Sequence, residues 1–137
     1  NIDYFIPNEK ELKLLIPDDT SIEEKAEALL KKGVKNVIVT LGEKGCYLRN
    51  EKYSMYFPAA EFHPVDTTGA ADAFISALAV CLSEENDIIY SICFATYAAG
   101  ISITRQGVQP AMVDRVGLDI YKEDINALYM NSLQQIQ

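Results

Sequence analysis

The sequence has little positive charge for its length. Its 137 residues include 12 Lys plus Arg against 20 Asp plus Glu, a formal net charge of −8. Proteins that hold nucleic acid or an anionic membrane by charge usually display a basic surplus or stripe, and here basic residues adjoin only at Lys31 and Lys32. We therefore expect neither nucleic acid nor a membrane among the partners.

Cysteine and histidine are too sparse for a disulfide framework or a zinc site. Cys46, Cys81 and Cys93 are odd in number, widely spaced and without a C-x-x-C pair, which favours reduced, mostly buried thiols. His63 is the single histidine and lacks ligand-spaced partners, so we expect a surface or strand-end residue there. A G-x-G-x-x-G motif is also missing, which argues against a dinucleotide-binding dehydrogenase.

No stretch has the pattern of a secretory signal or a membrane span. The first residues lack the basic region and long apolar run of a signal peptide, which favours a cytoplasmic protein. Residues 88–104 are uncharged, but tyrosines, a glycine and small polar residues interrupt a run that is slightly short for a span. We predict a buried helix there.

The remaining pattern is that of a globular α/β domain. With 49% hydrophobic and 23% charged residues, the chain should form a core, and its length suggests one domain. The residue patterns predict strands at 4–6, 34–41, 46–48, 52–57 and 62–65, and helices at 8–16, 22–32, 70–82, 87–103 and 121–133. This order predicts a partly parallel sheet with helical layers. Only 36–41 is a convincing buried parallel strand, so further strands are expected on the N-terminal side.

Residues 66–74, with the sequence D-T-T-G-A-A-D-A-F, are the most informative segment. Small residues that enter a helix leave backbone N–H groups unpaired and accessible at the positive end of the helix dipole, which makes a seat for an anion. Asp72 lies within the first turn and could act as a base for a nucleophile that attacks a bound phosphate. The alternative is an aspartate that only stabilises the start of its helix.

The segment resembles the D-T-x-G-A-G-D signature of the ribokinase-like (PfkB) carbohydrate kinases. Three further segments resemble elements of that family, in the family's order and approximate spacing. They are P-N-E-K-E at 7–11, V-I-V-T-L-G-E-K-G at 37–45 and T-R-Q-G-V-Q-P at 104–110. The resemblance covers nearly the whole chain. It implies the three-layer α/β/α ribokinase-like fold and the ATP-dependent phosphorylation of a sugar hydroxyl.

The family resemblance also implies roles for the residues of the 66–74 segment. Asp72 would be the general base, and Gly69, Ala70 and Ala71 would present backbone N–H groups to the transferring phosphoryl. The family usually has glycine where this chain has Ala71. An alanine causes no backbone strain at a helical φ, but it does at a positive φ. An alternative is therefore a non-catalytic nucleotide-binding or interaction module, and a weaker one is a kinase for a vitamin-like alcohol.

Other site residues are assigned by the same resemblance. Asn8 and Glu11 would help to hold Mg²⁺ through water near the nucleotide phosphates, although Asn followed three residues later by Glu is also a helix capping box. The expected nucleotide-binding residues are Asn8, Thr40, Gly42, Lys44, Gly45 and Thr96. The alternatives are a plain turn between strands at 42–45 and a packed mid-helix threonine at Thr96.

A monovalent-cation loop, usually for K⁺, is the last implied site. The corresponding residues are Asp66, Thr68, Ser102, Arg105, Gly107 and Ala111. Arg105 could instead anchor a loop. The expected partners are thus ATP with Mg²⁺ and a sugar, with a possible homodimer of the full-length protein.

The resemblance further implies that residues 1–137 are the C-terminal nucleotide-binding and catalytic portion of one ribokinase-like domain. No residue here matches the family's substrate-recognising carboxylate, di-glycine segment or β-sheet lid, which lie in the N-terminal portion. We expect this chain alone to be inactive and to carry an exposed apolar sheet edge.

Overall fold

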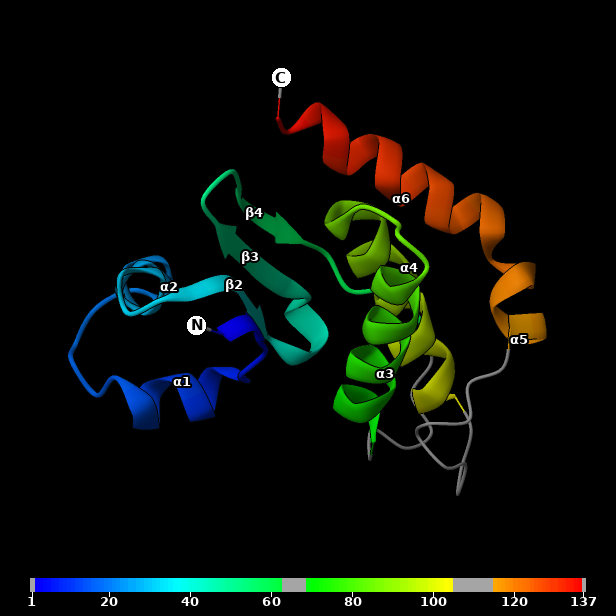
Figure 1. Cartoon of the computed structure of the whole chain (residues 1–137). Helices are drawn as coiled ribbons and strands as arrows, with labels where there is room; N and C mark the ends of the chain where they lie inside the picture. Colours follow the sequence, from blue (N-terminus) through cyan, green and yellow to red (C-terminus); the bar gives the residue numbers. More distant parts are fainter. Residues whose placement is uncertain (1, 63–68, 105–114, 137) are drawn as a thin grey trace. The chain divides into compact units, whose positions relative to one another are not determined.

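The computed structural model describes residues 2–62, 69–104 and 115–136. The chain divides into two compact units, residues 1–58 and 59–137 (Figure 1).

The first unit contains a mixed four-stranded sheet and two helices. In chain order its elements are β1 (Ile2–Phe5), α1 (Glu9–Leu15), α2 (Ile22–Lys31), β2 (Val34–Thr40), the 3₁₀ turn η1 (Gly42–Lys44), β3 (Cys46–Asn50) and β4 (Ser54–Phe57). The strand order is β1-β2-β3-β4. β1 pairs with β2 in parallel, and the β2–β3 and β3–β4 pairs are antiparallel. The predicted α/β class with a partly parallel sheet is confirmed.

Both helices of this unit begin at a side-chain cap. The hydroxyl of Ser21 accepts a hydrogen bond from the backbone N–H of Glu24 at 3.1 Å, and the Glu24 carboxylate accepts from Ser21 in return. This reciprocal capping box satisfies two N–H groups that the first helical turn leaves unpaired. Gly33, at φ 106°, follows the end of α2 and leads the chain into β2.

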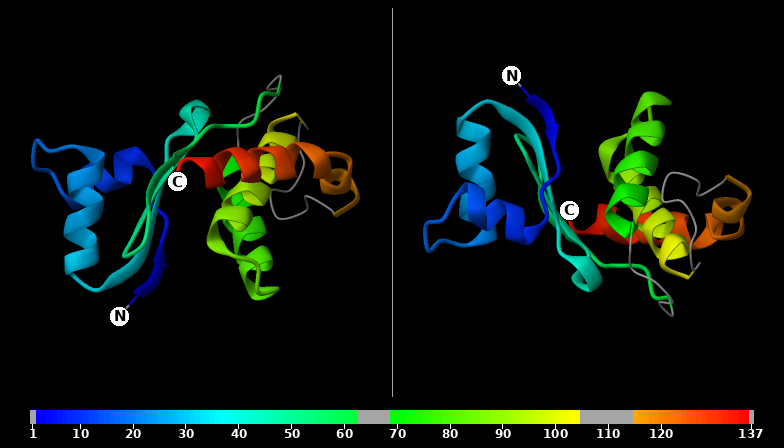
Figure 2. Two further views of the ribbon diagram at one scale, coloured as in Figure 1. Left: turned by 90° about the horizontal axis from the view of Figure 1, so that it is seen from above. Right: turned by 90° about the horizontal axis from the view of Figure 1, so that it is seen from below.

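The core of the first unit lies between the sheet and the two helices, which cover one of its faces (Figure 2). Val37, Val39 and Tyr47 are fully or almost fully buried there against Leu12 and Leu29. The residue between the two valines, Ile38, is also fully buried although it points to the other face.

β1 forms one edge of this sheet and carries exposed apolar side chains. Ile2 is 52% and Tyr4 40% exposed, and the pairing partner of β1 is β2 alone among the described strands. An edge strand with this composition favours pairing with a further strand. The expected exposed apolar edge is confirmed.

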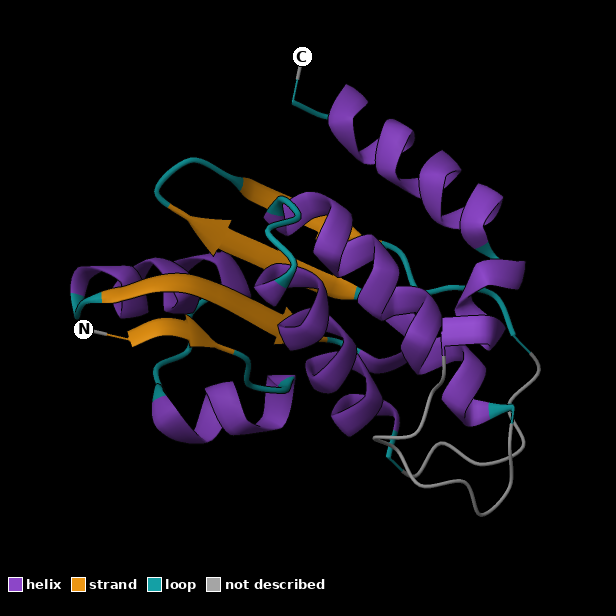
Figure 3. Ribbon diagram, turned by 45° about the vertical axis from the view of Figure 1, so that its right-hand side comes forward, coloured by secondary structure: helices purple, strands orange, loops and turns teal. Residues whose placement is uncertain are grey.

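The second unit is helical in its described residues. It contains α3 (Ala70–Ser83), α4 (Ile88–Ile103), α5 (Arg115–Ile120) and α6 (Lys122–Gln134). α3 and α4 pack along each other, and α6 packs against α4 (Figure 3). Gly100 of α4 lies against the ring of Phe62, where a Cβ atom would overlap the ring. Asp87 caps α4 by accepting a hydrogen bond from the N–H of Tyr90 at 2.8 Å.

Several expectations about the elements need correction or completion. β4 begins at Ser54 rather than at 52, because residues 51–53 form a turn. Phe62 lies outside any strand, and the rest of the predicted strand 62–65 falls outside the described residues, as does His63. The α5 helix was not predicted.

The predictions for the cysteines and for the uncharged run can both be checked. All three cysteines are buried and none of them is in a disulfide bond, as predicted. The uncharged run forms α4, which is largely buried. In the described part of the chain, no helix has the length and apolarity that a membrane crossing needs.

Candidate active site

In the first unit, the candidate nucleotide residues meet at the carboxyl ends of two parallel strands. β1 and β2 end at the same edge of the sheet, and just beyond β1 an isolated parallel bridge joins Asn8 to Thr40. The backbone N–H of Thr40 donates to the carbonyl of Pro7 at 2.9 Å. Ligands of open α/β sheets bind outside the carboxyl ends of the strands. The hydrogen bond to the Pro7 carbonyl thus holds Thr40 at the edge where a ligand would bind. The strand pairing shows this hydrogen bond, whereas the sequence does not indicate it.

Asn8 and Glu11 form a complete capping box at the start of α1. The Asn8 Oδ1 atom accepts from the N–H of Glu11 at 2.7 Å, and Glu11 Oε1 accepts from the N–H of Asn8 at 2.8 Å. Both residues are exposed at the candidate edge. The box occupies one oxygen of the Glu11 carboxylate, and a carboxylate has a second. The capping alternative is therefore confirmed, and a further role as a ligand of hydrated Mg²⁺ remains chemically compatible with it.

The segment between β2 and β3 is a tight turn that depends on two glycines. The N–H of Leu41 donates to Gly45 at 2.8 Å, and the N–H of Gly45 donates to Gly42 at 3.1 Å. Gly42 has φ 63° and Gly45 has φ 95°, values that favour glycine. Nothing lies within 4 Å of a Cβ built on Gly42, whereas one on Gly45 would overlap the Phe57 carbonyl. Gly42 thus presents open backbone at the edge, next to the exposed Lys44.

In the second unit, α3 begins with a glycine N-cap that is followed by two alanines. Gly69 is the N-cap in the left-handed conformation, at φ 84° and ψ 1°, and it has no side chain that could cap the helix. Ala70, Ala71 and Asp72 form the first turn, and the last two are exposed. The first N–H groups of a helix have no intrahelical acceptor, and small side chains leave them accessible. Asp72 adds an exposed carboxylate to the same turn.

The backbone at Ala71 is helical, which answers the question raised by the missing glycine. Ala71 lies inside α3, and Glu85 is the only described non-glycine residue with a positive φ. A methyl group at a helical φ causes no backbone strain. Ala71 therefore does not distort the first turn of α3.

Thr96 and Ser102, also in this unit, are buried on α4 and hydrogen-bond their own helix. Thr96 Oγ1 donates to the Ile92 carbonyl at 2.8 Å, and Ser102 Oγ donates to the Ala99 carbonyl at 2.7 Å. These bonds agree with the alternative of a packed mid-helix threonine. The remaining predicted cation-loop residues, Asp66, Thr68, Arg105, Gly107 and Ala111, lie outside the described residues.

The two sets of candidate residues belong to different units of the chain. The structure brings Asn8, Thr40 and the 42–45 turn together in the first unit, and Gly69 to Asp72 together in the second. Within the described ranges, no group of three His, Cys, Asp or Glu side chains could hold a metal ion directly. Mg²⁺ that keeps most of its waters does not need such a cluster.

Comparison with known proteins assigns the chain to a family. Residues 1–115 match the description "pfkB family carbohydrate kinase". The chain belongs to the PfkB family of carbohydrate kinases. A deoxyribokinase of Salmonella typhi is 39% identical to this PfkB chain over 111 residues, which cover 78% of this chain and 36% of the relative.

Solved structures agree with the fold of this PfkB chain. The ribokinase of Thermotoga maritima has a TM-score of 0.83 and 41% identity, over 88% of this chain and 42% of that one. The ribokinase of Arabidopsis thaliana, solved in complex with ribose and ATP, has a TM-score of 0.76 and 32% identity, over 93% of this chain and 41% of that one. The fold is therefore ribokinase-like. The PfkB chain spans about two fifths of the length of these relatives.

Proposed function

We propose that the complete protein containing this chain transfers the γ-phosphoryl group of ATP to a hydroxyl of a sugar. The relatives are named deoxyribokinase and ribokinase, and one of them is solved with ribose and ATP. Ribose and deoxyribose are accordingly the first acceptors to test. The observation that carries the proposal is the exposed Asp72 carboxylate in the first turn of α3, directly after the left-handed Gly69.

Asp72 acts in this proposal as the general base. Its carboxylate takes the proton of the acceptor hydroxyl while the hydroxyl oxygen bonds to the γ-phosphorus. The bond from that phosphorus to the β,γ-bridging oxygen breaks, and ADP leaves with the electron pair. General base assistance contributes about 10²–10⁴-fold to such a step.

The start of α3 supplies the anion hole. Backbone N–H groups of Gly69, Ala70 and Ala71 face the charge that develops on the phosphoryl oxygens, and the helix dipole adds to the field. These groups are preorganised because the left-handed Gly69 fixes the entry into the helix. The helical backbone of Ala71 supports the enzyme over the non-catalytic module, since it removes the strain argument for a disabled site.

The nucleotide and its cation are assigned to the edge of the first unit. The nucleotide would be lined by Thr40, the open backbone of Gly42, the ammonium of Lys44 and the turn at Gly45. For Thr96 of α4, a place next to the adenine rests on the family resemblance alone. Asn8 and the second oxygen of Glu11 would hold Mg²⁺ through water. When bound, Mg²⁺ neutralises charge on the phosphates. Ser102 and the undescribed residues of the cation loop remain proposed K⁺ ligands.

The chain of 137 residues is proposed to be the C-terminal part of one ribokinase-like domain. Because it spans about two fifths of its relatives, we expect the sugar-recognising groups to lie in the rest of the protein. The complete protein should form ribose or deoxyribose phosphate from ATP, and the isolated chain should not. Ion chromatography of the reaction mixtures, with each of the two proteins in turn, measures the sugar phosphate formed and tests this. ATP binding by the complete protein without sugar-dependent turnover would instead support the non-catalytic module.

A further inference from the structure

The first unit has a groove at the end of its sheet opposite the candidate edge. The groove has a volume of about 780 Å³ and is lined by α2, β2, β3 and the turn before β4. Val34 lines it and begins β2, whereas Thr40 ends β2. Asn36 is the lining residue of β2 nearest to Thr40, and at ~3.3 Å per residue it lies roughly 13 Å from Thr40 along the strand. The groove is therefore distinct from the proposed nucleotide site, and we name it the basic groove.

Cationic side chains outnumber anionic ones in the basic groove. The charged side chains that line it are Lys31, Lys35, Arg49, Lys52, Glu27 and Glu51. The surplus is positive, although the whole chain carries −8. Among the described residues the single ion pair joins Lys35 Nζ to Asp3 Oδ1 at 3.5 Å. Within the described ranges, Lys31, Arg49 and Lys52 therefore have no carboxylate partner, although the chain has an excess of carboxylates. The Arg49 guanidinium donates to the Asn50 carbonyl, and the Lys52 ammonium lies 5.2 Å from the centre of the Tyr53 ring.

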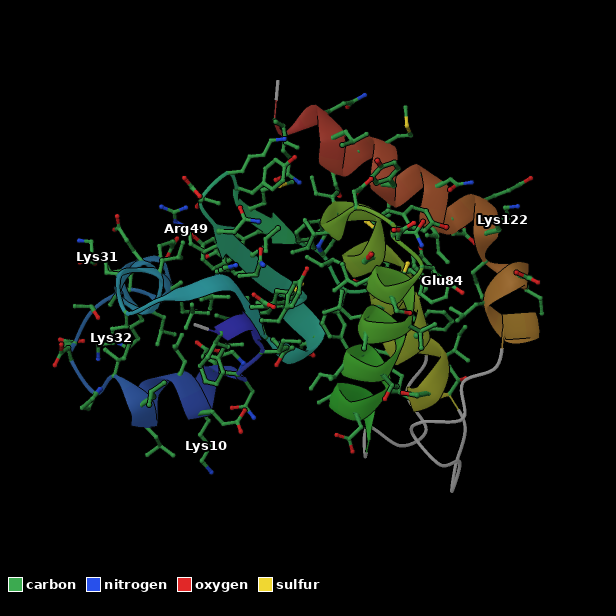
Figure 4. All side chains as sticks on the ribbon, viewed as in Figure 1. Lys10, Lys31, Lys32, Arg49, Glu84 and Lys122 are labelled. Atoms are coloured by element: carbon green, nitrogen blue, oxygen red, sulfur yellow. The ribbon has the colours of Figure 1, made fainter. Side chains whose placement is uncertain are left out.

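Helix electrostatics explain only part of this charge. Lys31 lies in the last turn of α2, where the helix dipole favours a cation. Arg49 lies on β3 and Lys52 in the following turn, where no helix terminus accounts for them. Figure 4 shows Lys31 and Arg49 extending from α2 and β3 on the same side of the unit. The cations that line the groove therefore come from separate elements.

Hydrogen bonds between asparagines fix the wall of the basic groove. Asn50 Oδ1 accepts from the backbone N–H groups of Lys52 at 2.9 Å and Tyr53 at 2.6 Å. Asn50 Nδ2 donates to Asn36 Oδ1 at 2.9 Å, and Asn36 Nδ2 donates to the Asp3 carbonyl, also at 2.9 Å. The turn that carries Lys52 is thereby tied to β1 and β2. Because this backbone is already ordered, less conformational entropy is lost when a ligand binds there.

We infer that the basic groove binds a small anion that carries more than one phosphate charge, with Lys31, Arg49 and Lys52 as its ligands. A guanidinium pairs with two phosphate oxygens at once, and the lysines add point charges. The volume lies in the range of about 300–1,000 Å³ that is typical of small-molecule sites. The inference is independent of the proposed kinase function, because none of the proposed catalytic residues lines the groove.

Binding of inorganic tripolyphosphate to the complete protein, measured by calorimetry at about 0.1 M salt, tests this inference. The double variant Arg49→Gln/Lys52→Gln should bind about tenfold more weakly or worse, since each charged hydrogen bond lost weakens binding. The matched controls Lys10→Gln and Lys122→Gln remove exposed lysines outside the basic groove, on α1 and α6 (Figure 4), and should bind like the wild type. Lys31→Gln, on the exposed end of α2, is a second variant if the double variant unfolds.

Amide chemical shifts then locate the bound anion. Tripolyphosphate should shift the amide signals of Asn36 and Asn50, a response that binding at the start of α3 alone would not give. Three results would overturn the inference: no saturable binding, equal affinity in the double variant, or shifts confined to residues 69–73. Tighter binding of a short RNA than of tripolyphosphate at the same residues would also overturn it, because the ligand would then be a macromolecule.

Discussion

Replacement of Gly45 by alanine should destabilise the first unit strongly, and replacement of Gly42 should not. Gly45 has φ 95° and ψ −134°, a region that is essentially restricted to glycine, and an alanine there costs about 1–3 kcal/mol in backbone strain. Its Cβ would also overlap the Phe57 carbonyl and Pro58. Displacing packed atoms adds about 1–3 kcal/mol. We expect a total loss of about 2–6 kcal/mol, which changes the unfolding equilibrium by about 25-fold or more.

Gly42 is the matched control because it lies in the same turn. It has φ 63°, where an L-residue costs about 1–2 kcal/mol, and its Cβ would meet no atom within 4 Å. Alanine also lowers the conformational entropy of the unfolded chain, which stabilises the folded state by about 0.4–1 kcal/mol. Urea unfolding of both variants, with hydrogen exchange of β3 and β4 as a local probe, measures the difference. Equal losses, or a larger loss for Gly42→Ala, would refute the steric argument at Gly45.

Three further predictions concern caps and thiols. Asn8→Ala should cost about 0.5–2 kcal/mol of unfolding free energy and Asn8→Asp much less, because Asp also caps; equal losses in urea unfolding would contradict this. Burial raises the pKa of the Cys93 thiol to about 12, so Cys93 in the native protein should resist a thiol reagent at about pH 8. The free energy of unfolding should fall as the pH rises from about 9, where the thiol of the unfolded chain ionises, towards 12. Rapid labelling of Cys93 in the native protein would contradict this. Asp87→Ala should destabilise more than Tyr129→Phe, since Asp87 caps α4 and also accepts from the Tyr129 hydroxyl at 2.7 Å; the reverse order in thermal unfolding would refute the capping role.

The parts of the fold that follow local rules could be predicted from the sequence. The Ser21 box, the Asp87 start of α4 and the β-branched run of β2 each depend on residues that are close in the chain. The strand predicted to begin at Phe62 is wrong at that residue because the contacts of Phe62 are with residues far away in the sequence. Its ring lies 5.2 Å from that of Tyr121 and 6.1 Å from that of Tyr97, edge to face, and against Gly100. The six-residue α5 is too short for its pattern to be recognised.

The candidate site was accessible from the sequence for a similar reason. The start of α3 and the 42–45 turn are local features, and their glycines indicate a backbone with positive φ. The bridge from Asn8 to Thr40 joins residues far apart in the chain and could not be derived from local pattern. The helical backbone at Ala71 likewise required the structure, since the sequence alone left both signs of φ open.

The most direct test of the account is the activity of Asp72→Asn in the complete protein. Its matched control is Asp124→Asn, which changes an exposed aspartate in the first turn of α6. We expect Asp72→Asn to lower sugar-dependent ADP formation by about 10²–10⁴-fold while ATP binding persists, and Asp124→Asn to leave both unchanged. Wild-type turnover by Asp72→Asn would contradict the assignment of Asp72 as the base.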